Sequence, residues 1–183
     1  IFLSFFLLIL TLPIVLTAGL LIWISDRGPI FYKQEREGLF RKKFNIYKLR
    51  SMIVNAEPSG PQWAAKNDKR ITFVGNILRK TRLDELPQLI SVLKGDMSLI
   101  GPRPERPEFN KLLDEDIPYY NLRHFLKPGL SGWAQVNYSY SSSINESKHK
   151  LSYDLYYISN YSIFIDLIIF FKTIRIICNG SGT

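Results

Sequence analysis

The most apolar stretch of the chain lies at its start, where residues 1–24 carry no charged side chain. Such a run is long enough for a membrane-inserted helix, which needs roughly 20 residues. A buried core helix is seldom apolar on every face, and a cleaved signal peptide would show a basic beginning and a small-residue cleavage pattern. The pattern therefore predicts a membrane-inserted helix over residues 1–25.

Pro13 lies in the middle of this predicted helix. Proline removes one backbone hydrogen bond and pushes the preceding residue, Leu12, out of helical geometry. A kinked helix that spans the bilayer and a helix-break-helix hairpin that enters and leaves on one face both satisfy these residues. Basic residues follow closely, which places the downstream side in the cytoplasm by the positive-inside rule; they are Arg27, Lys33, Arg36, Arg41, Lys42 and Lys43.

The residues after the apolar start alternate with period two. This alternation runs through residues 28–52 on both sides of Gly38, which predicts a β-hairpin. A loop rich in Pro, Gly and Ser follows at residues 57–62, and the two prolines of residues 101–104 (GPRP) fix an ordered turn.

Two helices are predicted between this loop and this turn. Residues 70–82 have the composition of a basic helix. Residues 84–94 are expected to form a second helix, with Asp84 as its N-cap, Pro87 in its first turn and Gly95 at its end.

The last apolar stretch, residues 151–178, mixes aromatic and aliphatic residues with isolated charges. These charges interrupt it too often for a membrane span. Because tyrosine is favoured at the level of the lipid headgroups, helices lying at a membrane interface fit this stretch as well as plain core helices do. The expected fold class is α+β, mostly helical with a small β-hairpin or sheet.

The composition sharpens this picture. The chain has 24 Lys and Arg against 16 Asp and Glu, and its net charge of +8 lies entirely outside the apolar start. This asymmetry excludes a wholly soluble, an acidic or a disordered protein. The single cysteine, Cys178, excludes a disulfide-stapled secreted module. Because the first residue is Ile rather than Met, we expect the sequence to be a piece of a longer chain.

Two adjacent acids, Asp84 and Glu85, are the strongest candidates for chemistry. Arg79, Lys80 and Arg82 precede them, and positive neighbours at a helix start favour ionised carboxylates. An ionised Asp among cations suits a phosphate target, either as a nucleophile or through a divalent metal. An Asp-Glu pair that merely caps a helix is the alternative.

Arg103 and His124 are weaker candidates. Two flanking prolines hold Arg103 rigidly, and a guanidinium on a fixed turn suits bidentate recognition of phosphate. His124 is either an acid–base group or a structural histidine. The sequence contains no glycine-rich phosphate loop, CxxC pair, HExxH or GxSxG motif. These residues indicate a membrane-attached protein with a basic site for phosphate.

Several segments, read together, resemble one bacterial family, the monotopic phosphoglycosyl transferases, which are polyprenol-phosphate sugar-phosphate transferases. The central block with LDELPQ, GDMSLIGPRP and GWAQVN is the most specific part. The segments PERPEF, WAQVNY and YDLYYISN are most similar to the catalytic domain of exopolysaccharide-initiating members. The resemblance covers nearly the whole chain, on residues 34–39, 44–52, 68–109, 123–138 and 153–174.

The resemblance implies a two-step mechanism on the Asp-Glu pair. Asp84 would attack the β-phosphorus of a UDP-sugar, expel UMP and hold the sugar phosphate as an acyl phosphate. Polyprenol (undecaprenyl) phosphate would then attack this intermediate to give a polyprenyl-diphosphate sugar, the first membrane step of exopolysaccharide, O-antigen or glycan assembly. Glu85 would bind the Mg²⁺ that the family requires. Lys48, Arg79 and the turn Pro102, Arg103 and Pro104 would bind the substrate.

The resemblance also bears on topology. Pro13 matches the proline that breaks the re-entrant membrane helix of the family, so the hairpin interpretation is favoured. Residues 1–25 would then be a re-entrant membrane helix. Residues 26–183 would form a catalytic domain on the cytoplasmic face of the bacterial inner membrane, with C-terminal amphipathic helices at the interface.

The chain departs from the family pattern at two places. Ser131 stands where threonine is common, which keeps a hydroxyl. Tyr138, Ser139 and Tyr140 follow the WAQVN motif where some relatives use an arginine. Phosphate contacts and sugar preference therefore cannot be carried over from this loop.

The expected partners are a UDP-sugar donor, a polyprenol phosphate acceptor and the membrane, with no nucleic acid. A homo-oligomer formed through a region upstream of Ile1 stays open. The competing class is a non-enzymatic membrane-anchored module whose basic surface binds anionic lipid or nucleic acid. Against that class, a polyanion-binding surface has no reason to gather its basic residues around a carboxylate pair.

Overall fold

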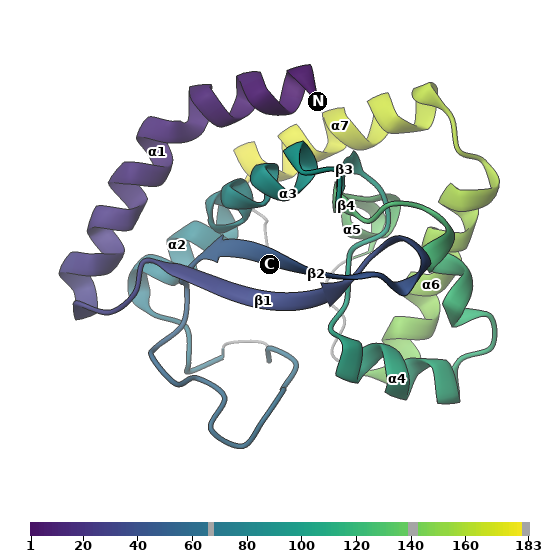
Figure 1. Cartoon of the computed structure of the whole chain (residues 1–183), viewed down its shortest axis with the longest axis horizontal. Coiled ribbons are helices and arrows are strands. Elements are labelled where there is room, and N and C mark those ends of the chain that lie inside the picture. Colours follow the sequence, from purple (N-terminus) through teal and green to yellow (C-terminus); the bar gives the residue numbers. More distant parts are fainter. Residues whose placement is uncertain (66–67, 139–142, 181–183) are drawn as a thin grey trace.

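The fold is α+β and mostly helical, as expected (Figure 1). The computed structural model describes residues 1–65, 68–138 and 143–180. The helices are α1 (Phe2–Asp26), α2 (Phe73–Lys80), α3 (Leu89–Leu93), α4 (Pro107–Asp116), α5 (Trp133–Asn137), α6 (Ile144–Ser159) and α7 (Ile163–Cys178), with the short 3₁₀-helices η1 (Leu39–Arg41), η2 (Leu83–Gln88) and η3 (Tyr120–Phe125). The strands are β1 (Phe31–Glu37), β2 (Lys43–Leu49), β3 (Ser98–Ile100) and β4 (Gly129–Ser131).

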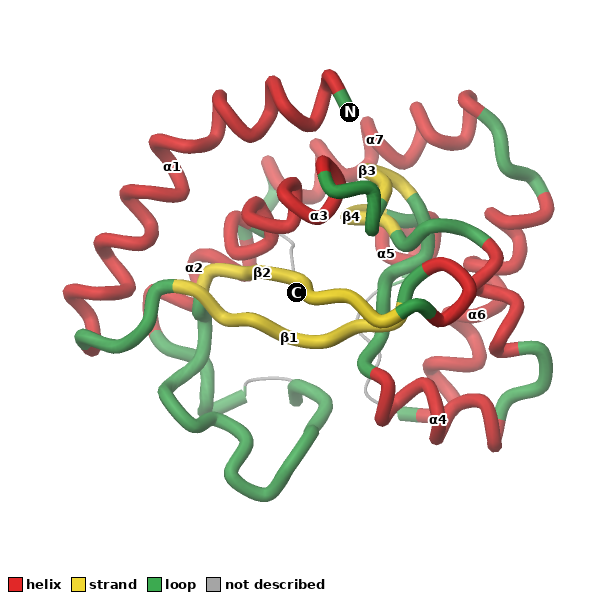
Figure 2. Tube along the Cα trace, viewed as in Figure 1, coloured by secondary structure: helices red, strands yellow, loops and turns green. Residues whose placement is uncertain are grey.

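Strands β1 and β2 form the predicted hairpin, which crosses the middle of the molecule (Figure 2). They pair antiparallel, from Phe31 opposite Leu49 to Glu37 opposite Lys43. Strand β2 buries alternate side chains, Phe44 and Ile46, against Val92 and Met97. The period of two in the sequence therefore reports a strand with one face on the core.

Helix α1 differs from the expectation at Pro13. The helix is continuous from Phe2 to Asp26 with Pro13 inside it, and Figure 1 shows a bend rather than a break. A single proline removes one donor, and the neighbouring turns continue on their own hydrogen bonds. Thr11 Oγ1 donates to the Leu7 carbonyl at 2.7 Å and Thr17 Oγ1 to the Pro13 carbonyl at 2.9 Å. The predicted break is thus corrected to a bend, while the re-entrant path stays a prediction.

The two halves of α1 have different surroundings. In the second half, Ala18 and Ile22 pack with Leu49 of β2 and Leu78 of α2. The first half exposes large apolar side chains such as Phe2 and Phe6, which are 92% and 61% exposed. Among the described residues, α1 is the one helix long and apolar enough to cross a membrane. A helix this exposed is no core helix of a soluble protein.

The two helices predicted before the turn need correction. The basic helix is shorter than residues 70–82: α2 begins after Thr72, whose Oγ1 accepts from the Gly75 backbone N–H at 2.9 Å. Asp84 is not an N-cap, because the segment begins as the 3₁₀-helix η2 and becomes the α-helix α3 only at Leu89. Pro87 has no N–H at the third helical position, where an N-cap side chain commonly accepts one.

The expected end and the expected turn are confirmed. Gly95 follows α3 with φ of 84°, which only glycine adopts without strain. The turn at residues 101–104 lies against β4 at backbone contact. A Cβ atom on Gly129 would lie 2.1 Å from the Gly101 backbone N, and one on Gly132 would lie 2.2 Å from the Gly101 carbonyl oxygen. The glycines of GPRP and PGLSGW are therefore fixed by packing.

The C-terminal stretch forms two helices of different character. Helix α6 contributes Leu151, Asp154 and Tyr157 to the interior. Helix α7 exposes large apolar side chains along the same edge of the molecule as the first half of α1 (Figure 1). Those exposed by two fifths or more are Ile163, Phe164, Leu167, Ile168, Phe171 and Ile174.

Candidate active site

The Asp84–Glu85 pair lies where β2, η2 and the Pro102–Pro104 turn meet. Both side chains are nearly buried, at 7% and 8% exposure. Lys48 Nζ of β2 donates to Glu85 Oε1 at 2.7 Å, and Arg103 Nη2 of the turn donates to the same oxygen at 2.6 Å. Two predicted residues from separate segments, Lys48 and Arg103, therefore meet at one oxygen of Glu85.

Arg79 joins this group from α2. Its Nε donates to Ser51 Oγ at 2.9 Å, and its positive charge acts on the Asp84 carboxyl. A Cβ atom on Gly75 would lie 1.9 Å from the Ser51 carbonyl oxygen, so only glycine lets α2 lie this close to the end of the hairpin. This close approach sets where Arg79 points.

The Pro102–Pro104 turn is held from behind by two arginines that the motifs did not reveal. Arg123 Nη2 donates to the Arg103 carbonyl at 2.7 Å, and Arg36 Nη1 donates to the Pro104 carbonyl at 3.0 Å. The Pro102 carbonyl accepts from the Gly129 backbone N–H at 2.9 Å. The prolines thus act through their carbonyl groups as an anchor that aims Arg103 at Glu85. Both arginines lie in segments that resemble the family, but neither was a candidate, because each acts on a carbonyl far away in sequence.

The two carboxyl groups of the pair have different electrostatic surroundings. Burial raises the pKa of Asp84 to about 6, although Lys48 opposes this effect. Burial would also raise the pKa of Glu85, but Arg103 and Lys48 outweigh it and hold that pKa well below its usual range. Burial lowers the pKa of Lys48, against the pull of Glu85. Glu85 therefore stays ionised, whereas Asp84 beside it takes up a proton more readily.

Comparison with known proteins identifies the family of the chain from its sequence. The sequence pattern described as bacterial sugar transferase matches residues 1–180. The chain belongs to the bacterial sugar transferase family. This membership confirms the resemblance drawn from LDELPQ, GPRP and GWAQVN.

Relatives of this chain carry specific names. It is 48% identical over 170 residues to a UDP-N-acetylgalactosamine-undecaprenyl-phosphate N-acetylgalactosaminephosphotransferase of Aeromonas hydrophila, covering 93% of this chain and 40% of that protein. It is 39% identical over 169 residues to a UDP-glucose:undecaprenyl-phosphate glucose-1-phosphate transferase of Escherichia coli (strain K12), covering 91% and 36%. It is 39% identical over 180 residues to the exopolysaccharide production protein PSS of Rhizobium leguminosarum bv. phaseoli, covering 95% and 90%. The chain therefore spans well under half of the first two relatives.

The carboxylates of this site fit Mg²⁺ in one particular way. Mg²⁺ commonly uses one or two protein carboxylates and completes its shell with water and substrate phosphates. Asp84 and Glu85 supply two such carboxylates. Within residues 1–65, 68–138 and 143–180, no cluster of three or more His, Cys, Asp or Glu side chains is placed to hold a metal. The residues thus suit an ion shared with a diphosphate rather than one enclosed by protein.

The remaining candidates lie apart from the pair. His124 is buried, its Nδ1 lies 3.3 Å from the Gly38 carbonyl oxygen, and burial lowers its pKa to about 4. It is therefore a structural histidine. Ser131 Oγ lies 2.6 Å from Thr173 Oγ1, so the hydroxyl ties β4 to α7. Of the loop at 138–140, residues 139 and 140 lie outside the described residues.

Proposed function

We propose that this sugar transferase moves a sugar 1-phosphate from a UDP-sugar to polyprenol phosphate, releases UMP and forms a polyprenyl-diphosphate sugar. The observation that carries the proposal is a nearly buried Asp-Glu pair surrounded by Lys48, Arg79 and Arg103. The names of the relatives, which specify UDP-sugars and undecaprenyl phosphate, support the same reaction.

Asp84 is the proposed nucleophile. Its carboxylate oxygen forms a bond to the β-phosphorus, the bond from that phosphorus to the bridging oxygen breaks, and UMP leaves with the electron pair. A phosphate oxygen of the polyprenol then attacks the same phosphorus and releases the Asp84 carboxylate. The Asp84 carboxylate is thus the nucleophile of the first step and the leaving group of the second, so no other protein nucleophile is required.

The cations make this attack feasible. A carboxylate approaches a diphosphate only where the negative charge of the diphosphate is neutralised, and Lys48, Arg79 and Arg103 are placed to do so. Arg103 offers a planar guanidinium on a fixed turn, which suits two phosphate oxygens at once. Bound Mg²⁺, held by Glu85 together with the diphosphate, would supply further charge neutralisation at the phosphates.

The exposed apolar surface supports a site at a membrane. Residues 1–25 form the proposed re-entrant membrane helix, and residues 26–183 the catalytic domain on the cytoplasmic face of the bacterial inner membrane. Support comes from the exposed apolar side chains of α1 and α7, which would otherwise face water. An acceptor with a polyprenol tail requires a site at this level.

The test is UMP formation by the full chain in detergent, with Mg²⁺, UDP-sugars and undecaprenyl phosphate. The proposal predicts UMP and a lipid-linked sugar diphosphate in equal amounts. Tight, salt-sensitive binding of nucleic acid without UMP formation from any donor would favour the membrane-anchored binding module instead.

A further inference from the structure

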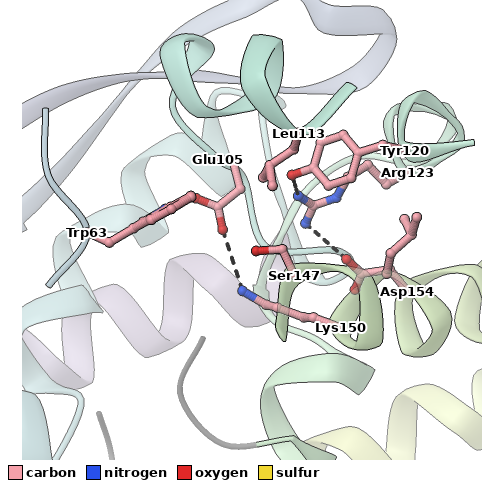
Figure 3. Close-up of a pocket in the computed structure, with 9 residues that line it drawn as sticks. Trp63, Glu105, Leu113, Tyr120, Arg123, Ser147, Lys150 and Asp154 are labelled. Atoms are coloured by element: carbon pink, nitrogen blue, oxygen red, sulfur yellow. Dashed lines mark hydrogen bonds and ion pairs between the residues drawn. The ribbon is translucent and has the colours of Figure 1, made fainter. Parts of the chain in front are cut away.

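A second group of charged side chains surrounds a small cavity behind the Pro102–Pro104 turn (Figure 3). The cavity has a volume of about 40 Å³. A single water needs about 10–15 Å³ measured in the same way, so this cavity admits a group of a few atoms rather than a whole sugar ring. Its lining residues are Trp63, Glu105, Leu113, Tyr120, Arg123, Ser147, Lys150, Leu151 and Asp154.

The charges around this cavity are balanced. Arg123 Nη2 donates to Asp154 Oδ2 at 2.9 Å, and Lys150 Nζ lies 3.5 Å from Glu105 Oε1. Two cations and two carboxylates therefore line the cavity, and Arg36, from outside the lining, donates to the second oxygen of Glu105 at 3.3 Å. An anionic phosphate gains little from such a site, whereas a neutral group with both a donor and an acceptor can pair with both signs of charge.

The Lys150–Glu105 pair is the looser of the two pairs. Its 3.5 Å separation exceeds the 2.7–3.2 Å that is typical of N–H···O hydrogen bonds. A hydroxyl or an amide placed beside it could accept from Lys150 and donate to Glu105. Both side chains keep some exposure, at 19% and 18%, while Arg123 and Asp154 are nearly inaccessible. The Lys150–Glu105 pair is therefore the one that a ligand can reach.

The cavity adjoins the proposed phosphate site. Arg103 donates to Glu85 through its side chain, and its own carbonyl accepts from Arg123, which lines the cavity. The negative charge of Glu105 acts on the Arg103 guanidinium. Because a sugar is bonded directly to the β-phosphate, its substituents must lie within one ring of that phosphate. The cavity adjoins the backbone of Arg103, whose guanidinium would hold that phosphate.

An aromatic wall closes one side of the cavity. Trp63 stacks on Phe109 with ring centroids 4.7 Å apart, and Arg70 Nη2 donates to the Trp63 carbonyl at 3.2 Å. Figure 3 shows the indole at the edge of the cavity beside Glu105. Ligand sites commonly combine such an apolar wall with a few convergent polar groups.

We propose that this cavity recognises a polar substituent of the donor sugar, a hydroxyl or an acetamido group, with Glu105 and Lys150 as its specificity-determining pair. This inference rests on the proposed function. In this proposal the cavity recognises the sugar, and the cationic site around Asp84 binds the diphosphate.

The test compares the parent with Lys150→Met and Glu105→Gln. UMP release is measured with UDP-glucose, UDP-galactose and their two N-acetylhexosamine counterparts, and inhibition by UMP is measured separately. We expect kcat/KM to fall about tenfold or more for the preferred donor and about threefold or less for the poorest one, since a site built to bond a substituent discriminates against donors that lack it. Inhibition by UMP should not change.

Lys148→Met is the matched control, because Lys148 lies on the same helix and is exposed. It should leave all four donors unchanged. An equal loss with every donor would overturn the inference and indicate a purely structural pair, and weaker inhibition by UMP would overturn it in favour of a nucleotide-base pocket. A parent that releases UMP from no donor would refute the proposed function, and this inference with it.

Discussion

Two groups of buried charges lie on either side of the Pro102–Pro104 turn, and they differ in charge balance. Around Asp84 and Glu85, cations from three segments accumulate near two carboxylates, and one oxygen of Glu85 accepts from two of them. The lining of the cavity holds two cations and two carboxylates, and Arg36 bonds Glu105 from outside that lining. An accumulation of positive charge prepares a site for a multiply charged ligand, whereas balanced charges stabilise a fold or bind neutral groups.

The strongest test of this difference replaces one aspartate in each group by asparagine. Asp84→Asn should lower turnover about 1,000-fold or more, because an amide cannot form the acyl phosphate, and should leave the thermal midpoint nearly unchanged. Asp154→Asn should do the reverse. It leaves Arg123 buried without its counter-charge, at a cost of about 3–5 kcal/mol, while each folded molecule keeps turnover within about tenfold of the parent.

Turnover and the thermal midpoint are measured on the same preparations of both variants. Substantial UMP release by Asp84→Asn would show that another group is the nucleophile. A stable but inactive Asp154→Asn would show that the cavity, too, belongs to the chemistry.

The next largest effect concerns Glu85 and Mg²⁺. In Glu85→Gln, the Mg²⁺ concentration for half-maximal rate should rise about tenfold or more, because a neutral amide is a poorer ligand for a hard cation. Glu108→Gln is the matched control, since Glu108 is 57% exposed and pairs only loosely with Arg106 at 3.7 Å. An unchanged Mg²⁺ titration of Glu85→Gln would mean that Glu85 only positions Lys48 and Arg103.

His124 tests how burial beside cations acts on a group that no carboxylate bonds. Burial and the neighbouring Arg123 lower its pKa to about 4. As the pH falls, the unfolded chain therefore protonates this histidine at a higher pH than the folded chain does. Stability from this group is therefore complete above its unfolded pKa of about 6.5 and is lost as the pH falls toward 4, by about 2 kcal/mol between pH 7 and pH 5.

The measurement is the thermal midpoint of the full chain between pH 7 and pH 5. The midpoint of the parent should fall by about 4–8 °C more than that of His124→Gln. His149→Gln, which alters the exposed second histidine, should follow the parent. Equal slopes for the parent and His124→Gln would show that His124 is not held neutral by burial.

The residues of the candidate site were largely identifiable from the sequence, because most of them lie in short motifs. Asp84 and Glu85 are adjacent, and Arg79 and Arg103 lie within twenty residues of them. The supporting residues were not predictable. Arg123 acts on a carbonyl 20 positions away, and Lys150 meets Glu105 across 45 positions. Such pairs arise from how the helices pack, and no local pattern marks them.

The fold shows the same division. The hairpin was predictable, because a period of two has one physical interpretation. The second helix was not, because Asp84 has the residue type of an N-cap but lies inside a 3₁₀-helix that begins after Arg82, whose φ is 55°. The residues around Pro13 left a kinked helix and a helix-break-helix hairpin open, and the family resemblance favoured the break. In the structure, hydrogen bonds and packing elsewhere in α1 keep the helix continuous.

The smallest expected effect extends the comparison to α1, which carries no charge before Asp26. A cysteine placed at Ile1 in a Cys178→Ser background should resist a membrane-impermeant thiol reagent applied to intact cells, because both ends of a re-entrant helix face the cytoplasm. Pro13→Ala should straighten the helix and expose a fraction of the molecules to labelling. Labelling of the parent from outside would establish a spanning helix.

The central claim is that Asp84 carries the sugar phosphate covalently. The most direct measurement mixes the full chain with a UDP-sugar labelled in its sugar and with Mg²⁺, without any polyprenol phosphate. The account predicts a burst of about one UMP per protein molecule and label bound to the parent but not to Asp84→Asn, with the label discharged when undecaprenyl phosphate is added. Formation of UMP only after the acceptor is added, with no labelled protein at any time, would contradict it.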